Sequence, residues 1–218
     1  MKALVLTVCS KQKSPKCDKK PTVSRLPDLQ QLRYELLNLV RNNVELAQKQ
    51  PNLDGILNES ALATNVFDLY DGVLYKQCRD KLKKLPSNVK VLVVSAFYGL
   101  VEPHENLKTY ELRMDDELSE RQKVWQFWYK KGLNSILKWY IVREEVGIVW
   151  SLLPNLYGKI FDIPCWSVFA VTKSGKRLGN ALDYVRGRWL KFMLENPQYL
   201  FCEPLREIPG LDYIFVYR

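Results

Sequence analysis

The 218-residue sequence lacks any apolar run close to the about 18 residues that cross a bilayer. Its opening apolar run, residues 3–8, is shorter than the core of a signal peptide, and no small-residue cleavage site follows it. These absences argue against a membrane-spanning or secreted protein. We therefore expect a cytoplasmic protein with no membrane partner.

Cysteine and histidine are too few and too scattered to indicate a metal site or a disulfide framework. The five cysteines are odd in number and form no CxxC pair, which zinc sites and redox motifs commonly use. The single histidine, His104, lies beside a proline in a loop, where a surface position is commoner than a catalytic role. We expect reduced thiols, no metal and no cofactor.

Positive charge is what the sequence has in excess. Lys and Arg number 33 against 24 Asp and Glu, so the formal net charge is +9. One interpretation is a polyanionic partner, such as DNA, another nucleic acid or a nucleotide, and the other is a solvated lysine-rich surface. Residues 10–22 form a basic loop, because Pro15 and Pro21 prevent a helix there.

The apolar pattern predicts an α/β protein with a mixed, largely parallel sheet flanked by helices, in a single domain that spans residues 1–218. The nearly continuous apolar run at 89–95 is typical of a strand that is covered on both faces. A Ser119–Gln122 capping box predicts the start of a helix that runs to about residue 140. The other predicted strands lie at 3–8, 146–153, 165–171 and 211–217, and the other predicted helices at about 27–49, 73–84, 156–161 and 178–195.

Three of the predicted strands end in polar residues. The first runs into Cys9 and Ser10, the second ends in Ser95, and Asn155 follows the third. Ligands of open α/β sheets bind outside the carboxyl ends of the strands, so these tips predict one crevice if the strands are parallel neighbours. The alternative is that Ser and Asn are ordinary turn residues. The candidate catalytic residues are Cys9, Ser10, Ser95, Tyr98 and Asn155.

Two other features have both a structural and a functional interpretation. Cys9 is a candidate nucleophile, because Lys11 and Lys13 would favour its thiolate, or else a buried and inert strand-end cysteine. Gly187 lies inside a predicted helix, where either close packing or an approaching phosphate would explain it. Arg186 and Arg188 are about 200° apart on that helix, so at most one of them points into the crevice.

A series of segments in order along the chain resembles the YaaA family of peroxide-stress proteins. The resemblance is carried by "DGVLY" at Asp71–Tyr75, by "VVSAFYGLVEP" with the downstream "YELRM", by "VWQFWYKKGLNSIL", by Asn155, Tyr157 and Lys159, and by "VRGRWLKFML". It covers residues 66–195 well and the first 65 residues poorly. The opening "CSKQKSP" departs from the family's Ser-Pro-Ala-Lys type of segment, and Leu156 stands where the family has Glu.

The resemblance implies a mixed α/β fold with a positively charged cleft, DNA binding, and protection against oxidative damage. Aromatic side chains in such a cleft would stack on exposed bases, while lysines and arginines would contact phosphates. The alternative is an enzyme that acts on a nucleotide or nucleobase in the same cleft, by base modification or glycosidic-bond chemistry. The candidate nucleic-acid-binding residues are Lys11, Lys13, Tyr110, Arg113, Trp128, Lys130, Lys131, Lys159, Arg186 and Arg188.

Overall fold

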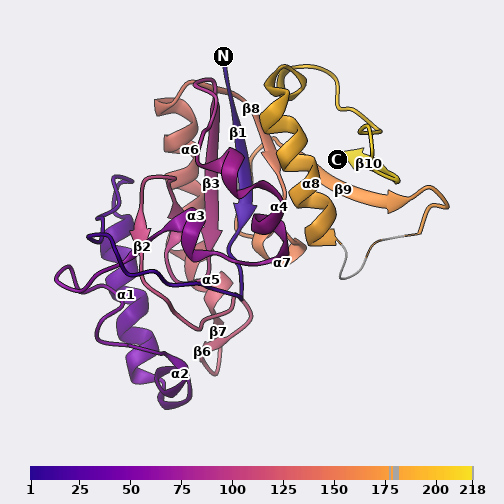
Figure 1. The fold of residues 1–218 in the computed structure, drawn as a ribbon. Coiled ribbons are helices and arrows are strands. Elements are labelled where there is room, and N and C mark those ends of the chain that lie inside the picture. Colours follow the sequence, from indigo (N-terminus) through magenta and orange to yellow (C-terminus); the bar gives the residue numbers. More distant parts are fainter. Residues whose placement is uncertain (177, 179–181, 218) are drawn as a thin grey trace.

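A six-stranded sheet forms the centre of the computed structural model, which describes residues 1–176, 178 and 182–217 (Figure 1). The strand order is β10-β9-β8-β1-β3-β4. Strands β1, β3, β8 and β9 run parallel, while β4 and β10 are antiparallel edge strands. The mixed, largely parallel α/β fold is therefore confirmed. The strand bounds are β1 Lys2–Val8, β3 Val89–Ser95, β4 Gly99–Val101, β8 Val146–Ser151, β9 Trp166–Thr172 and β10 Tyr213–Tyr217.

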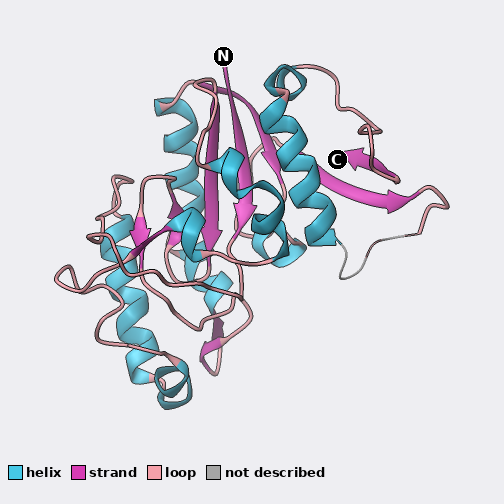
Figure 2. Cartoon of the chain, in the orientation of Figure 1, coloured by secondary structure: helices cyan, strands magenta, loops and turns pink. Residues whose placement is uncertain are grey.

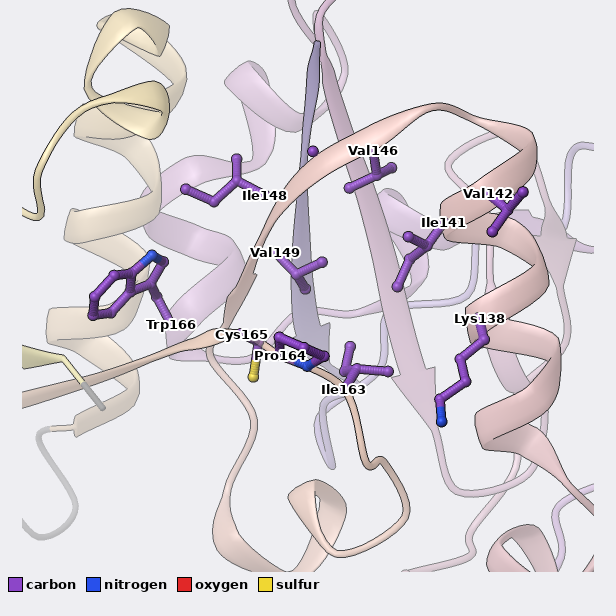
Figure 3. Close-up of a pocket in the computed structure, with 11 residues that line it drawn as sticks. Lys138, Ile141, Val142, Val146, Ile148, Val149, Ile163, Pro164, Cys165 and Trp166 are labelled. Atoms are coloured by element: carbon purple, nitrogen blue, oxygen red, sulfur yellow. The ribbon is translucent and has the colours of Figure 1, made fainter.

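Helices cover both faces of this sheet (Figure 2). Helices α4 and α8 lie side by side in front of it, and α6 lies on the opposite face (Figures 1 and 3). No helix in the described part of the chain is both long and apolar enough to cross a membrane. The helices are α1 Leu29–Asn42, α2 Val44–Lys49, α3 Val66–Leu69, α4 Val73–Leu82, α5 Val124–Lys130, α6 Leu133–Arg143, α7 Asn155–Gly158 and α8 Leu182–Glu195, followed by a 3₁₀ turn at Pro197–Phe201.

Two of the predicted helices differ in extent from the helices that the structure describes. The helix predicted at 27–49 is interrupted at Asn43, whose backbone is extended and whose Oδ1 accepts a hydrogen bond from the Leu46 N–H at 3.1 Å. Asn43 therefore caps the start of α2, a role that apolar periodicity alone does not reveal. The helix predicted at 178–195 is seen from Leu182, and its first turn falls partly outside the described residues.

The Ser119–Gln122 capping box was a wrong prediction. These residues belong to a small hairpin of β6 (Glu117–Ser119) and β7 (Gln122–Lys123), and the helix begins only at Val124. Gln126 makes the reciprocal bond instead, since its Oε1 accepts from the Lys123 N–H at 2.8 Å. Gly132, at φ +79°, then separates α5 from α6. A further pair of short strands, β2 (Thr64–Asn65) and β5 (Asn106–Leu107), also lies outside the main sheet.

A buried ion pair holds the turn that follows β3. Arg33 on α1 is 1% exposed and Glu105 is fully buried, and their Nη1 and Oε2 atoms are 2.8 Å apart. The same guanidinium donates to the carbonyl oxygens of Tyr98 at 2.9 Å and Leu100 at 3.0 Å. Gly99 lies between these two carbonyls at φ +68°, a conformation that favours glycine. The pair therefore fixes the chain that leads from β3 towards Tyr110.

Gly187 is explained by helix packing. A Cβ atom added to it would lie 2.5 Å from the backbone oxygen of Leu74, on the neighbouring helix α4. Of the two interpretations of this glycine, the structure therefore supports close approach of α8 to α4.

Candidate functional site

The polar strand tips share one edge of the sheet. Strand β1 lies between β3 and β8 and runs parallel to both, with Val8 opposite Val94 and Leu6 opposite Ser151. The Cys9 N–H donates to the Val94 carbonyl at 3.0 Å, so Cys9 lies directly beside the end of β3. The chain after Ser151 then turns into α7, which brings Tyr157 back towards the tip of β1.

A cavity of about 70 Å³ opens at this edge. Part of its lining comes from the tip of β1 and the basic loop, part from the segment 110–113, and part from α7. Six of the candidate catalytic and nucleic-acid-binding residues line it together: Cys9, Ser10, Lys11, Lys13, Tyr110 and Arg113. The other lining residues are Glu111, Leu112 and Tyr157. This cavity is the candidate functional site.

The sulfur of Cys9 contacts a tyrosine hydroxyl in this cavity. Cys9 is half-buried, and its Sγ lies 3.3 Å from the Tyr157 Oη. Burial raises the pKa of Tyr157 well above its ordinary value, and the charge of Cys9 adds to this effect, so the phenol stays protonated. A protonated phenol can donate a hydrogen bond to the sulfur.

A buried lysine lines the same cavity. The Lys13 side chain is only 6% exposed, and its Nζ lies 4.3 Å from the centroid of the Tyr110 ring. Its nearest carboxylate, Glu111, is 3.9 Å away. Burial lowers the pKa of Lys13, while the charges of Glu111 and Cys9 act in the opposite direction. The ammonium is therefore a stronger acid than that of an ordinary surface lysine.

Behind the cavity lies a network of hydroxyl groups that is closed to solvent. The Tyr110 Oη is 2.8 Å from the Ser95 Oγ and 3.1 Å from the Tyr70 Oη, and the Ser95 Oγ accepts from the Tyr98 N–H at 3.0 Å. Burial raises the pKa of both Tyr70 and Tyr110 well above the ordinary tyrosine value. Ser95 therefore does not line the cavity, and it contacts the cavity-lining residue Tyr110 through the hydrogen bond between their hydroxyl groups. The sequence prediction missed Tyr70, although it directly precedes the "DGVLY" segment.

Two aromatic candidates lie in the core and are not available to stack on a base. Tyr98 is 2% exposed, and its hydroxyl bonds to the carbonyl oxygens of Ile56 at 3.3 Å and Lys108 at 3.1 Å. Trp128 is fully buried, and its indole N–H donates to the Ala96 carbonyl at 2.8 Å. Each ring fills the interior around the turn after β3. The expectation that they face a ligand does not fit this placement.

The remaining candidates on α5 and α7 are exposed and lie outside the cavity lining. Asn155 is the first residue of α7, and Lys159 directly follows that helix. The Lys159 Nζ lies 5.7 Å from the centroid of the Trp125 ring. Lys130 ends α5, while Lys131 is engaged with Glu35 at 2.6 Å. Lys159 is therefore not part of the cavity lining, and Lys131 has a carboxylate partner of its own.

Arg186 reaches towards the same sheet edge from α8. It is 4% exposed, donates to the Leu153 carbonyl at 3.4 Å, and lies 3.8 Å from Asp183. Its Nε is buried and has no hydrogen-bond partner, and burial lowers the pKa of the guanidinium. Arg188 is half-buried on the same helix. One arginine of the pair thus points inward.

A larger hollow lies on the face of the sheet that α6 covers, between α6, β8 and the start of β9 (Figure 3). Its volume is about 820 Å³, and apolar side chains such as Ile141, Ile148 and Ile163 line it, with Lys138 as its charged member. Cys165 is also in the lining, where burial raises the pKa of its thiol. The hollow is therefore mainly apolar, whereas most side chains that line the small cavity are polar or charged.

The fold and the site define an α/β protein with a cavity at the carboxyl edge of its parallel strands, lined by a thiol, three basic side chains and a carboxylate. Among the described residues, no group of three His, Cys, Asp or Glu side chains is placed to share a metal ion. Residues 6–216 match the family described as "Peroxide stress protein YaaA". Because this match covers almost the whole chain, the protein belongs to that family.

Curated relatives resemble the chain at low sequence identity. A UPF0246 protein of Lachnoclostridium phytofermentans is 24% identical over 207 aligned positions, and the match covers 86% of this chain and 77% of the relative. A UPF0246 protein of Francisella tularensis is 25% identical over 146 aligned positions, and the match covers 63% of this chain and 57% of the relative. A UPF0246 protein of Clostridioides difficile is 24% identical over 176 aligned positions, and the match covers 73% of this chain and 68% of the relative. The chain thus spans just over half the length of the Francisella relative.

Proposed function

We propose that this protein binds nucleic acid, DNA above all, through the cationic edge of the sheet, and that it does so in the response to peroxide stress that its family name describes. The observation that supports this most directly is the meeting of Lys11, Lys13 and Arg113 around one cavity. These residues come from two segments about a hundred positions apart in the sequence. Their convergence brings three of the chain's 33 Lys and Arg side chains around one cavity, which supports attraction of an anion there.

Most of the positively charged side chains considered for this edge have no carboxylate partner. Among the described residues, Lys11, Arg113 and Lys159 form no ion pair with a carboxylate, and Lys13 has only the 3.9 Å contact with Glu111. Lysine and arginine side chains that lack a carboxylate partner can replace the counterions of a phosphate backbone. The three cations that line the cavity are enough for several phosphate contacts.

The size of the cavity favours a phosphate over a base. One buried water needs about 10–15 Å³, so a cavity of about 70 Å³ holds about five to seven waters. A phosphate group fits that space, whereas even a pyrimidine ring with its exocyclic groups has more heavy atoms. An enzyme that draws a flipped base into a pocket needs room for the whole base. Chemistry on a nucleobase would therefore require this cavity to widen.

Salt-dependent binding tests the proposal. Fluorescence anisotropy with a labelled duplex and with a single strand should show an affinity that falls steeply with salt. Three phosphate contacts give a slope of log K against log salt of about −2.7, which is roughly a 40-fold loss between about 50 and 200 mM salt. Absence of binding to either DNA at low salt would contradict the proposal.

Matched variants locate the contact surface. Lys11→Gln and Arg113→Gln should each reduce the magnitude of the salt slope by about 1, because each removes one phosphate contact. Lys84→Gln is the control, since this exposed lysine follows α4 and precedes the amino end of β3, at the opposite edge of the sheet. Equal losses in all three variants would mean that the charge acts without a defined site.

A further inference from the structure

We propose that Cys9 is a peroxide-reactive thiol, which hydrogen peroxide entering the small cavity oxidises to a sulfenic acid. This inference rests on the proposed role in peroxide stress and is independent of DNA binding. It assigns a chemical step to the cavity, and hydrogen peroxide is the substrate. The arrangement of the thiol, a hydroxyl and a lysine in a space of matching size carries the inference.

The neighbours of Cys9 supply what a thiol needs to attack peroxide. The thiolate is the nucleophilic form of cysteine, and a nearby lysine ammonium favours it. Lys13 and Cys9 line the same cavity, and the Lys13 side chain is only 6% exposed. The Tyr157 hydroxyl, 3.3 Å from the sulfur, holds the side chain in place and remains protonated. Cys9 is therefore one member of a cluster of functional groups.

The cavity also selects for a small oxidant. Its volume of about 70 Å³ accommodates peroxide with several waters, and Lys11, Lys13 and Arg113 line it with hydrogen-bond donors. A peroxide oxygen that approaches Cys9 can accept hydrogen bonds from these groups. Bulky hydroperoxides would not fit beside the sulfur in the space that the structure shows.

The reaction balances without a further redox partner. The Cys9 thiol loses its proton to solvent, and the thiolate sulfur attacks one oxygen of the peroxide. An S–O bond forms, the O–O bond breaks, and the departing hydroxide takes a proton from the Lys13 ammonium and leaves as water. Cys9 is oxidised by two electrons to the sulfenic acid, and the peroxide is reduced. Lys13 then regains its proton from solvent. Its lowered pKa makes it a better acid for this step than an ordinary lysine.

The other cysteines serve as internal controls. Cys17 and Cys202 are exposed, while Cys78 is buried and burial raises the pKa of its thiol to about 12. Neither Cys17 nor Cys202 lines the cavity that contains Lys13 and Tyr157. Exposure alone therefore predicts that Cys17 and Cys202 react first, whereas the proposal predicts that Cys9 does.

The experiment follows all five thiols in the unmodified protein, in the absence of nucleic acid. The reduced chain is treated with hydrogen peroxide in the presence of dimedone, which traps sulfenic acids, and each cysteine peptide is quantified by mass spectrometry over time. We expect Cys9 to be labelled at least about tenfold faster than Cys17 or Cys202, as a thiol beside a lysine should be. Labelling of Cys9 no faster than that of the two exposed cysteines would overturn the proposal. Because no DNA is present, this result is separate from the binding test.

Two variants then test the roles of the neighbours. Lys13→Met and Tyr157→Phe should each slow the labelling of Cys9 several-fold and leave that of Cys17 unchanged. Lys19→Met is the control, since this exposed lysine of the same loop lies outside the cavity. Far-ultraviolet circular dichroism and melting curves verify that each variant is folded. An unchanged Cys9 rate in Lys13→Met would refute the proton transfer from Lys13 and with it the proposed step.

Discussion

Replacing Arg33 with methionine should destabilise the protein strongly. Met fills a similar length of apolar space but removes the guanidinium, which bonds to Glu105 at 2.8 Å, to the Tyr98 carbonyl at 2.9 Å and to the Leu100 carbonyl at 3.0 Å. Glu105 is fully buried, so its carboxylate would be left without its counter-ion in the core. Breaking a buried pair in this way costs about 3–5 kcal/mol.

Urea denaturation and thermal melting can measure this loss. For a domain of this size, 1 kcal/mol corresponds to about 2–4 °C, so the melting temperature should fall by roughly 6–20 °C. The double variant Arg33→Met/Glu105→Leu removes both charges, and should recover about 2–3 kcal/mol relative to the sum of the single losses. The coupling identifies the ion pair itself, and not lost packing, as the source of the effect.

An exposed pair provides the control for this prediction. Lys49 and Glu45 are 2.7 Å apart, slightly closer than the buried pair, but their side chains are 48% and 80% exposed. Lys49→Met should therefore change stability little, because water screens the pair. A loss for Arg33→Met as small as that for Lys49→Met, or fully additive single losses, would refute the reasoning that burial makes the Arg33 pair essential.

Two more predictions follow from the site and its supporting helices. Gly187→Ala should cost about 1–3 kcal/mol despite the better helix propensity of alanine, because its Cβ would lie 2.5 Å from the Leu74 oxygen and separate α8 from α4. Gly158→Ala, where nothing lies within 4 Å, is the control, and similar melting temperatures for both variants would contradict this account. The stability of the native protein relative to Lys13→Met should rise with pH in the window below the ordinary lysine pKa of 10.5, because the unfolded chain there binds more protons than the folded one. Urea midpoints of both proteins can be measured across that window. A difference between the two midpoints that did not change with pH would disprove this prediction.

Part of the candidate site could be predicted from the sequence because it depends on strand order. Parallel strands place their carboxyl ends at one edge, so Cys9 and Ser95 were expected to lie close together. Lys11 and Lys13 follow β1 so closely that they had to remain near the same edge. Tyr110 and Arg113 were also singled out, because they lie in the segment "YELRM" that carries part of the family resemblance. These are short-range consequences of a correct fold prediction.

Other parts could not be predicted because no local pattern records them. Tyr98 and Trp128 were expected to face a ligand, but a sequence does not show which side of a turn an aromatic ring will fill. Arg33 and Glu105 are 72 positions apart, so their pairing has no sequence signature. The Ser119–Gln122 segment satisfied a helix-capping pattern and still formed a hairpin, because pairing between β6 and β7 outweighed the local preference.

The sequence by itself determined the α/β class, the positions of the main strands and the excess of positive charge. Each of these depends on composition or on hydrophobic periodicity, which act over a few residues. Only the tertiary structure decided that Lys13 is buried in the cavity that Cys9 lines, that Tyr157 of α7 contacts the Cys9 sulfur, and that Tyr98 belongs to the core. These outcomes depend on burial and on contacts between distant segments, which exist only once the chain has packed.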